Sequence, residues 1–268
     1  MSEGGALILA NNTGCSHQLW RRAAVIASIL CLSFVLASCA STGPDEETYD
    51  PLLKANRGIY KFNDVIDTII VEPLATGYVK VTPKPVRTSV SNFFDNASYA
   101  GTILSDFLQG KGKQGVRDTS RFLVNSTLGL AGLFDPATGL GLKKHDEDFG
   151  QTLGVWGANQ GAYLVLPLLG PNTVRDTPDL AVSTATSGLF WAGFYVSAAV
   201  TIPVGILAAI DERARAENSI RFVNEMALDP YLFTREAWTQ HRTFLIHDGN
   251  PPVPEFDDEF GEPGEDTF

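Results

Sequence analysis

The sequence LAVSTATSGLFWAGFYVSAAVTIPVGILAAI, from Leu180 to Ile210, contains no charged side chain over 31 residues. A bilayer-spanning helix needs roughly 20 apolar residues, so the stretch is long enough to cross a membrane. However, Gly188, Gly193 and Pro203 interrupt it, and its first half is rich in serine and threonine. Because glycine and proline weaken or kink helices, the pattern favours two shorter helices, embedded in or lying along an apolar surface and meeting near Pro203, over a single span.

Helical spacing of apolar residues continues through much of the remaining chain. Apolar positions recur every three or four residues after Asp50-Pro51, which predicts a long helix with Asp50 as its N-cap and its end at Pro73. Gly110 is expected to end another helical segment. The further predicted helices cover residues 90–94, 103–108, 115–127 and 230–244. These patterns predict an all-α fold.

The segment from Leu130 to Pro171 is rich in glycine, with leucine, phenylalanine and tryptophan between the glycines. Each glycine costs a helix about 1 kcal/mol, so loops are expected here. Loops are normally polar, and apolar irregular backbone therefore indicates burial in protein or around a cavity. Within this segment, residues 164–169 (LVLPLL) either line an apolar path for lipid or belong to the core.

Composition excludes two broad classes of protein. The 268 residues are 44% hydrophobic and 19% charged, which is enough apolar content to bury a core and excludes a disordered chain. Acidic residues number 31 and basic residues 20, giving a net charge of −11. A nucleic-acid-binding protein would need the opposite sign, and the low charged fraction indicates contact with apolar surroundings.

The first forty residues have the pattern of a bacterial export signal with a lipidation site. Arg21-Arg22 precede an uncharged run over residues 23–37, which is followed by Ser38-Cys39. At 15 residues the run is shorter than a spanning helix, so it is interpreted as a cleaved signal. Leu36-Ala37-Ser38-Cys39 resembles the lipobox, which implies that Cys39 is acylated and becomes the new N-terminus. Several acyl chains hold a protein stably on a membrane, at about 0.8 kcal/mol per buried methylene.

These signals divide the chain into four segments. Residues 1–38 are expected to be a signal peptide with an N-terminal extension, and residues 39–50 a lipidated cysteine and polar tether. Residues 51–246 form the helical domain. Residues 247–268 form an acidic tail, predicted to be disordered because residues 251–268 carry seven acidic and no basic side chains.

No motif for catalysis, a metal or a cofactor is found. The chain contains no Gly-x-Ser-x-Gly, no nucleotide-binding glycine loop, and neither the His-x-x-x-His nor the His-Glu-x-x-His spacing of zinc sites. The mixed-charge run over residues 143–148 is interpreted as a solvated turn. Four arginines within apolar or amphipathic segments need an anionic partner, and internal ion pairs or helix-end carbonyl groups are favoured over phospholipid phosphate. These arginines are Arg57, Arg87, Arg121 and Arg175.

A series of motifs, in order along the chain, resembles the MlaA (VacJ) family of outer-membrane lipoproteins over about residues 36–246. The N-terminal extension lies outside this resemblance. Residues 185–210 match the family only in hydrophobic character, so no channel-lining residue of the family is assigned within them. The motifs include Asp50-Pro51-Leu52, Asn56-Arg57, Phe62-Asn63, Arg121-Phe122-x-x-Asn125, Gly132-x-x-Asp135-Pro136, Asp148-Phe149-Gly150-Gln151-Thr152-Leu153-Gly154, Tyr163-x-x-Leu166-Pro167 and Asp229-Pro230-Tyr231.

The resemblance implies a ring-shaped bundle of amphipathic helices, with glycine-rich apolar loops around a central channel. It places the protein in the outer membrane, lipid-anchored and embedded from the periplasmic side, beside a trimeric porin. Phospholipids misplaced in the outer leaflet would pass through the channel to a soluble periplasmic lipid carrier, which maintains lipid asymmetry. The residues expected to line the channel are Leu164, Val165, Leu166, Leu168, Leu169 and Arg175.

Two other functions remain open from the sequence. The first is a structural, porin-associated envelope lipoprotein without transfer activity. The second, a lipid hydrolase, is weaker because the glycine-framed nucleophilic serine of such enzymes is missing.

Overall fold

The computed structural model describes residues 48–252, and this part of the chain is mostly helical. The predicted signal peptide, Cys39 and nearly all of the tether lie outside the described residues, as does the acidic tail from residue 253 onward.

The first helical unit is longer than predicted. Helix α2 (Leu53–Ile66), the π-helical turn η1 (Asp67–Val71) and helix α3 (Glu72–Val81) follow one another without a break. The prediction that this helix ends at Pro73 is therefore wrong. A proline ring collides with the carbonyl group four residues earlier in an α-helix, and the wider π-turn just before Pro73 relieves that contact.

Asp50 does not cap α2, contrary to prediction. The N-cap is Leu52, and no side chain bonds to the first turn. Asp50 instead accepts hydrogen bonds from Asn56, Tyr231 and Arg235, and therefore connects α2 to the end of the chain.

The next two helices form an antiparallel pair. The segments predicted separately at residues 90–94 and 103–108 belong to one helix, α4 (Lys84–Leu108). The helix continues between them because Tyr99 and Thr102, which carry polar groups, are buried there in place of purely apolar side chains. Gly110 ends it as predicted, with a φ of 78°. Helix α5 (Gly112–Thr127) confirms the helix predicted at residues 115–127.

The glycine-rich segment contains two short helices and a β-hairpin, α6 (Pro136–Gly139), α7 (Phe149–Val155), β1 (Tyr163–Leu166) and β2 (Gly170–Thr173). The strands are antiparallel, with Tyr163 opposite Thr173 and Leu166 opposite Gly170. The predicted helical fold class is confirmed, and this two-stranded hairpin is the sheet that the described residues add to it. Burial alternates along β1, as expected where one face of a strand meets the core.

The uncharged stretch folds into α8 (Asp179–Thr186), α9 (Gly188–Ala192) and the first turns of α10 (Ala198–Met226). The predicted break at Pro203 is wrong. Pro203 lies near the start of α10, where it removes only the bond that would reach Ala199. Among residues 48–252, no helix has both the length and the apolar character needed to cross a bilayer.

The last helix is α11 (Pro230–Ile246), which confirms the helix predicted at residues 230–244. Contacts between elements close a circuit: α3 contacts α10, α10 contacts α4, α4 contacts α7, and α7 contacts α11. The hairpin completes it, since β2 contacts α11 and β1 contacts α2.

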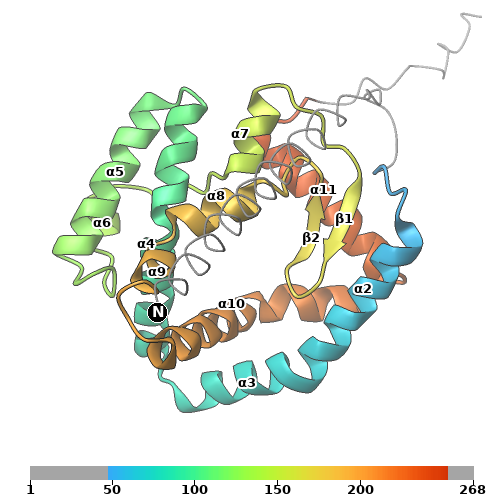
Figure 1. The fold of residues 1–268 in the computed structure, drawn as a ribbon, viewed down its shortest axis with the longest axis horizontal. Helices are drawn as coiled ribbons and strands as arrows, with labels where there is room; N and C mark the ends of the chain where they lie inside the picture. Colours follow the sequence, from blue (N-terminus) through green and yellow to red (C-terminus); the bar gives the residue numbers. More distant parts are fainter. Residues whose placement is uncertain (1–47, 253–268) are drawn as a thin grey trace, which may run out of the picture.

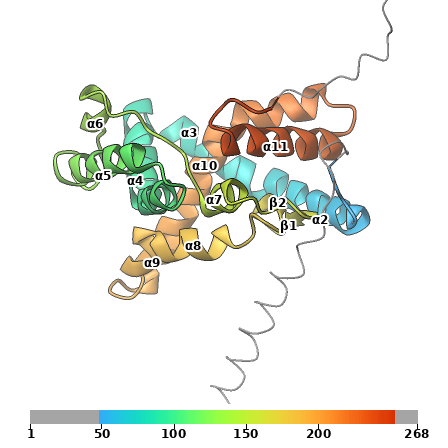
Figure 2. The same cartoon turned by 90° about the horizontal axis from the view of Figure 1, so that it is seen from above.

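Figure 1 shows the resulting ring of ribbons, with α5 and α6 on its outer edge beside α4. Seen from its edge in Figure 2, the ring has α8 and α9 on one side and α11 on the other. The compact apolar core is small and lies at the hairpin, where Tyr163, Val165 and Tyr231 are buried together.

Candidate functional site

Five of the six residues predicted to line a channel lie on the β-hairpin or its turn. Leu168 and Leu169 are 69% and 65% exposed at the hairpin tip, and Leu164 and Leu166 are half-buried on β1. In Figure 1 the hairpin lies along the inner side of α2, on the side of the central gap in the ribbon.

Two of the six predicted residues lie inside the protein. Val165 is 2% exposed and packs in the core with Tyr163. Arg175 follows β2, is 9% exposed, and its Nε donates to Asp176 at 3.1 Å. Their burial corrects the prediction, because a side chain covered by protein cannot line an open path. The geometry of Arg175 matches the alternative of an internal ion pair.

Two asparagines of α2 hold the hairpin by its outer edge. Asn56 Nδ2 donates to the carbonyl oxygen of Tyr163 at 3.0 Å, and its Oδ1 accepts from the N–H of Val165 at 3.0 Å. Asn63 Nδ2 likewise donates to the carbonyl oxygen of Leu166 at 3.0 Å, and its Oδ1 accepts from the N–H of Leu168 at 2.8 Å. Seven residues make about two helical turns, so both amides lie on one face of α2 and satisfy strand groups that have no neighbouring strand. The sequence motifs containing these asparagines gave no hint of this role.

The first turns of α2 and α11 contact each other beside these asparagines. Arg57 on α2 pairs with Asp229 at 2.7 Å, and its guanidinium lies 4.9 Å from the ring centre of Tyr231. Asp229 also caps α11 by accepting from the Leu232 N–H at 3.1 Å. This backbone bond and then the bond from Arg57 hold the pKa of Asp229 below its usual value.

A buried ionic network joins α7 to α11. Arg242 pairs with Asp148, the N-cap of α7, and with Asp176 at 2.8 Å. Burial alone would raise the pKa of Asp148, but the hydrogen bond and charge of Arg242 keep it below its usual value. A Cβ on Gly150 would lie 2.3 Å from Asp176 Oδ1, so only glycine fits. The motif over residues 148–154 therefore builds the ring.

Three of the four arginines singled out in the sequence have carboxylate partners. Arg57 pairs with Asp229, Arg121 pairs with Asp135 at 2.6 Å, and Arg175 pairs with its neighbour Asp176. Arg87 differs, because its Nε is buried without a hydrogen-bond partner in the described structure.

The mixed-charge run over residues 143–148 is not the solvated turn that was predicted. Lys144 binds Asp95 at 2.6 Å, and Glu147 accepts from Lys111 at 2.8 Å. His145 Nδ1 lies 2.9 Å from Asp118, which is fully buried. The partners lie between 27 and 49 residues away along the chain, so the sequence pattern could not reveal them.

A buried pair of carboxyl groups adjoins this run. Burial, together with the hydrogen bond and charge of the nearby Asp118, raises the pKa of Asp106 to about 7. Gln114 donates to Asp106 at 2.8 Å. Among the described residues, no group of three or more histidine, cysteine, aspartate and glutamate side chains could hold a metal ion.

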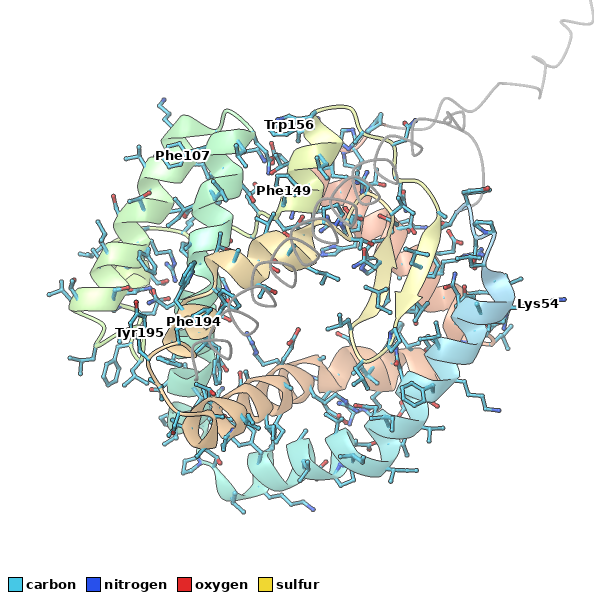
Figure 3. All side chains as sticks on the ribbon, viewed as in Figure 1. Lys54, Phe107, Phe149, Trp156, Phe194 and Tyr195 are labelled. Carbon is cyan, nitrogen blue, oxygen red and sulfur yellow. The ribbon has the colours of Figure 1, made fainter. Side chains whose placement is uncertain are left out.

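Aromatic side chains gather on the face that carries α9. Trp191, Phe194 and Tyr195 are 55%, 67% and 89% exposed, and Phe194 and Tyr195 lie together near α9 in Figure 3. The ring of Phe190 packs against those of Trp191 and Phe194 at 5.5 and 5.3 Å. Exposed aromatic groups with a polar end are typical of membrane–water interfaces and binding surfaces.

Comparison with known proteins gives concordant matches. The family model described as MlaA lipoprotein matches residues 48–245. The intermembrane phospholipid transport system lipoprotein MlaA of Escherichia coli (strain K12) is 34% identical over 225 residues, covering 80% of this chain and 86% of that protein. Its namesake in Haemophilus influenzae is 30% identical over 230 residues, covering 84% and 91%.

A solved structure shows the same fold. It is described as "Structural basis for maintenance of bacterial outer membrane lipid asymmetry" and superposes with a TM-score of 0.64 at 31% identity. The match covers 74% of this chain and 98% of that chain.

Proposed function

This chain belongs to the MlaA lipoprotein family, and from that premise we propose that it is the outer-membrane lipoprotein of an intermembrane phospholipid transport system. It removes misplaced phospholipids from the outer leaflet of the outer membrane and so maintains lipid asymmetry. The names of the Escherichia coli and Haemophilus influenzae relatives and the subject of the matching structure support this function.

The observation that carries the transport mechanism is the pair of exposed leucines at the hairpin tip. Leu168 and Leu169 project from a hairpin that two asparagines fix to the inner side of the ring. Adjacent exposed leucines are stable where they meet another apolar group, such as an acyl chain. In this proposal Leu164, Leu166, Leu168 and Leu169 form the apolar side of a central channel.

The channel lowers the main barrier to lipid movement. A charged headgroup crosses hydrocarbon only at high cost, and a path through a protein ring shelters it. Movement of phospholipid toward the periplasm needs no nucleotide in this component, since a soluble periplasmic lipid carrier withdraws the phospholipid that has passed through the channel. We assign the chain no catalytic residue and no cofactor.

The aromatic face supports embedding in the inner leaflet of the outer membrane. Trp191 and Tyr195 are residue types that favour the interface, and Phe194 adds apolar area beside them. With this face in the leaflet, α11 on the opposite side of the ring faces the periplasm (Figure 2). Acyl chains on Cys39 add a second attachment, and the family resemblance supports a trimeric porin as a neighbour in the membrane.

Reconstitution tests transfer directly. The lipidated protein in vesicles with labelled phospholipid should speed delivery to the carrier, whereas a purely structural lipoprotein would not. Replacing both Leu168 and Leu169 with aspartate should lower the rate by about tenfold or more, because charge is unfavourable on an apolar path. Leu140→Asp is the control, since Leu140 is also 65% exposed but follows α6 on the outer edge. Wild-type protein without transfer activity would refute the proposal.

A further inference from the structure

Two adjoining cavities lie where α3, α4 and α10 meet, away from the hairpin. One has a volume of about 310 Å³ and is lined by residues that include Lys84, Arg87 and Arg215. The other, of about 340 Å³, is lined by Lys80, the carboxylate of Glu217, and the apolar Ala75 and Val79 among others. Arg87 and Ala214 line both cavities, so the two adjoin at these residues.

The charges in the first cavity do not balance. Its carboxylate, Asp211, is 1% exposed and already accepts from Ser91 at 2.8 Å and Tyr78 at 3.1 Å. Arg215 Nε lies 3.2 Å from this carboxylate, so the two charges offset each other. Arg215 also binds Asp95 at 2.9 Å.

The remaining cations in the two cavities have no acidic partner within the part of the chain that the structure describes. Lys84 and Arg87 begin α4, and Lys80 lies in the last turn of α3. Three positive charges from two helix ends therefore line the two adjoining cavities. The carboxylate of Glu217 in the second cavity is already bound by Arg213 at 2.6 Å, and the protein as a whole is negatively charged. Like charges that line neighbouring cavities repel one another, and an anion between them would offset the repulsion.

Arg87 gives an independent indication of a missing anion. Its Nε is buried and has no hydrogen-bond partner in the described structure. An unsatisfied, buried N–H of a charged group is costly, and such groups in proteins normally have an acceptor.

We propose that the Lys80–Lys84–Arg87 site binds a phosphate group. The planar guanidinium of Arg87 suits two oxygens of a tetrahedral anion, and lysines add charge from other directions. The volume exceeds that of a phosphate ion, and Ala75 and Val79 offer apolar contact to a group attached to the phosphate. This favours a phospholipid headgroup, an assignment that rests on the proposed function, although free phosphate has the same chemistry.

Binding is measured by calorimetry on the full chain in detergent. The ligands are inorganic phosphate, short-chain dihexanoyl phosphatidylglycerol and dihexanoylglycerol, which lacks the phosphate. Wild-type protein should bind the first two and not the third. Phosphatidylglycerol binding more than tenfold tighter than phosphate identifies the headgroup as the ligand, and equal affinities identify free phosphate.

A matched pair of variants tests the location. Lys84→Glu should weaken phosphate binding by about tenfold or more, because it replaces an attractive charge with a repulsive one. Lys113→Glu makes the same change at another exposed lysine in the first turn of a helix, α5, and should alter binding less than twofold. Arg87→Lys keeps the charge without the planar fork and should bind with intermediate affinity.

Equal effects of Lys84→Glu and Lys113→Glu, or wild-type binding of the phosphate-free lipid as tight as that of phosphatidylglycerol, would overturn the site. The proposed function is judged separately from lipid delivery to the carrier. Wild-type protein that binds phosphate but delivers no lipid would refute transport alone, whereas wild-type transport with no phosphate binding would refute this inference alone.

Discussion

Replacing Asn56 with alanine should destabilise the ring where α2 meets the buried edge of the hairpin. Asn56 is 2% exposed and bonds the Tyr163 carbonyl and the Val165 N–H, which are themselves buried. The alanine variant leaves both backbone groups without partners where water cannot reach them. Each such loss costs about 1–3 kcal/mol, so the free energy of unfolding should fall by about 2–6 kcal/mol. This is a large share of the roughly 5–15 kcal/mol that stabilises a typical domain.

Asn63→Ala is the matched control on the same face of α2. Asn63 makes the same two types of bond, but one partner is the N–H of Leu168, whose side chain is 69% exposed. Water can replace the lost bonds at this exposed end of the hairpin, so the expected loss is about 1–2 kcal/mol in total.

Denaturation in detergent, followed by far-ultraviolet circular dichroism, measures both losses. Asn56→Ala should lower the midpoint temperature by roughly 10 °C and Asn63→Ala by a few degrees. If the two variants lose equal stability, burial does not determine how much these asparagine hydrogen bonds contribute to the free energy of unfolding, and the reasoning fails.

Three further predictions concern other parts of the chain. Gly150→Ala should lower stability by about 3 kcal/mol or more in a thermal melt, because its Cβ would lie 2.3 Å from Asp176 Oδ1, whereas Gly139→Ala has no atom within 4 Å and should have little effect. Burial raises the pKa of Asp106 from 3.8 to about 7, so the folded state binds the extra proton and stability should fall as pH rises between these values. Asp106→Asn should remove that fall, on the order of 2 kcal/mol, in denaturation curves at pH 5 and 8, and an unchanged slope would contradict the assignment. Cys39→Ala should leave an unacylated, unprocessed precursor, and mass spectrometry showing cleavage at another residue would refute the lipobox assignment.

Helices with regular apolar spacing were predictable from the sequence, and those with polar interiors were not. The helices at residues 115–127 and 230–244 were found because their apolar positions recur at helical intervals. The middle of α4 was missed, since its inward-facing residues there are polar, among them Thr102. Pro73 misled the prediction because a π-turn, which depends on packing, accommodates it.

The site was predictable in composition but not in geometry. Residues 164–169 were identified from their apolar character, yet a short apolar run does not distinguish strand from helix or loop. Gly161 before the run and Pro167 and Gly170 within and after it are turn residues that could have indicated the hairpin. The partners of Arg57 and Asn56 lie 172 and 107 residues away, and no local pattern encodes such distances.

The contacts that join residues near the start of α2 to residues near the start of α11 have a consequence for the assembly of the ring. Asp50 bonds Tyr231 and Arg235, and Arg57 bonds Asp229, so residues at the beginning of the domain depend on residues at its end. A chain is synthesised N-terminus first, so the ring stays open until nearly all of the domain has emerged. During that interval the apolar hairpin and α2 lack their covering helix, so the packing of α11 is the step that closes the ring.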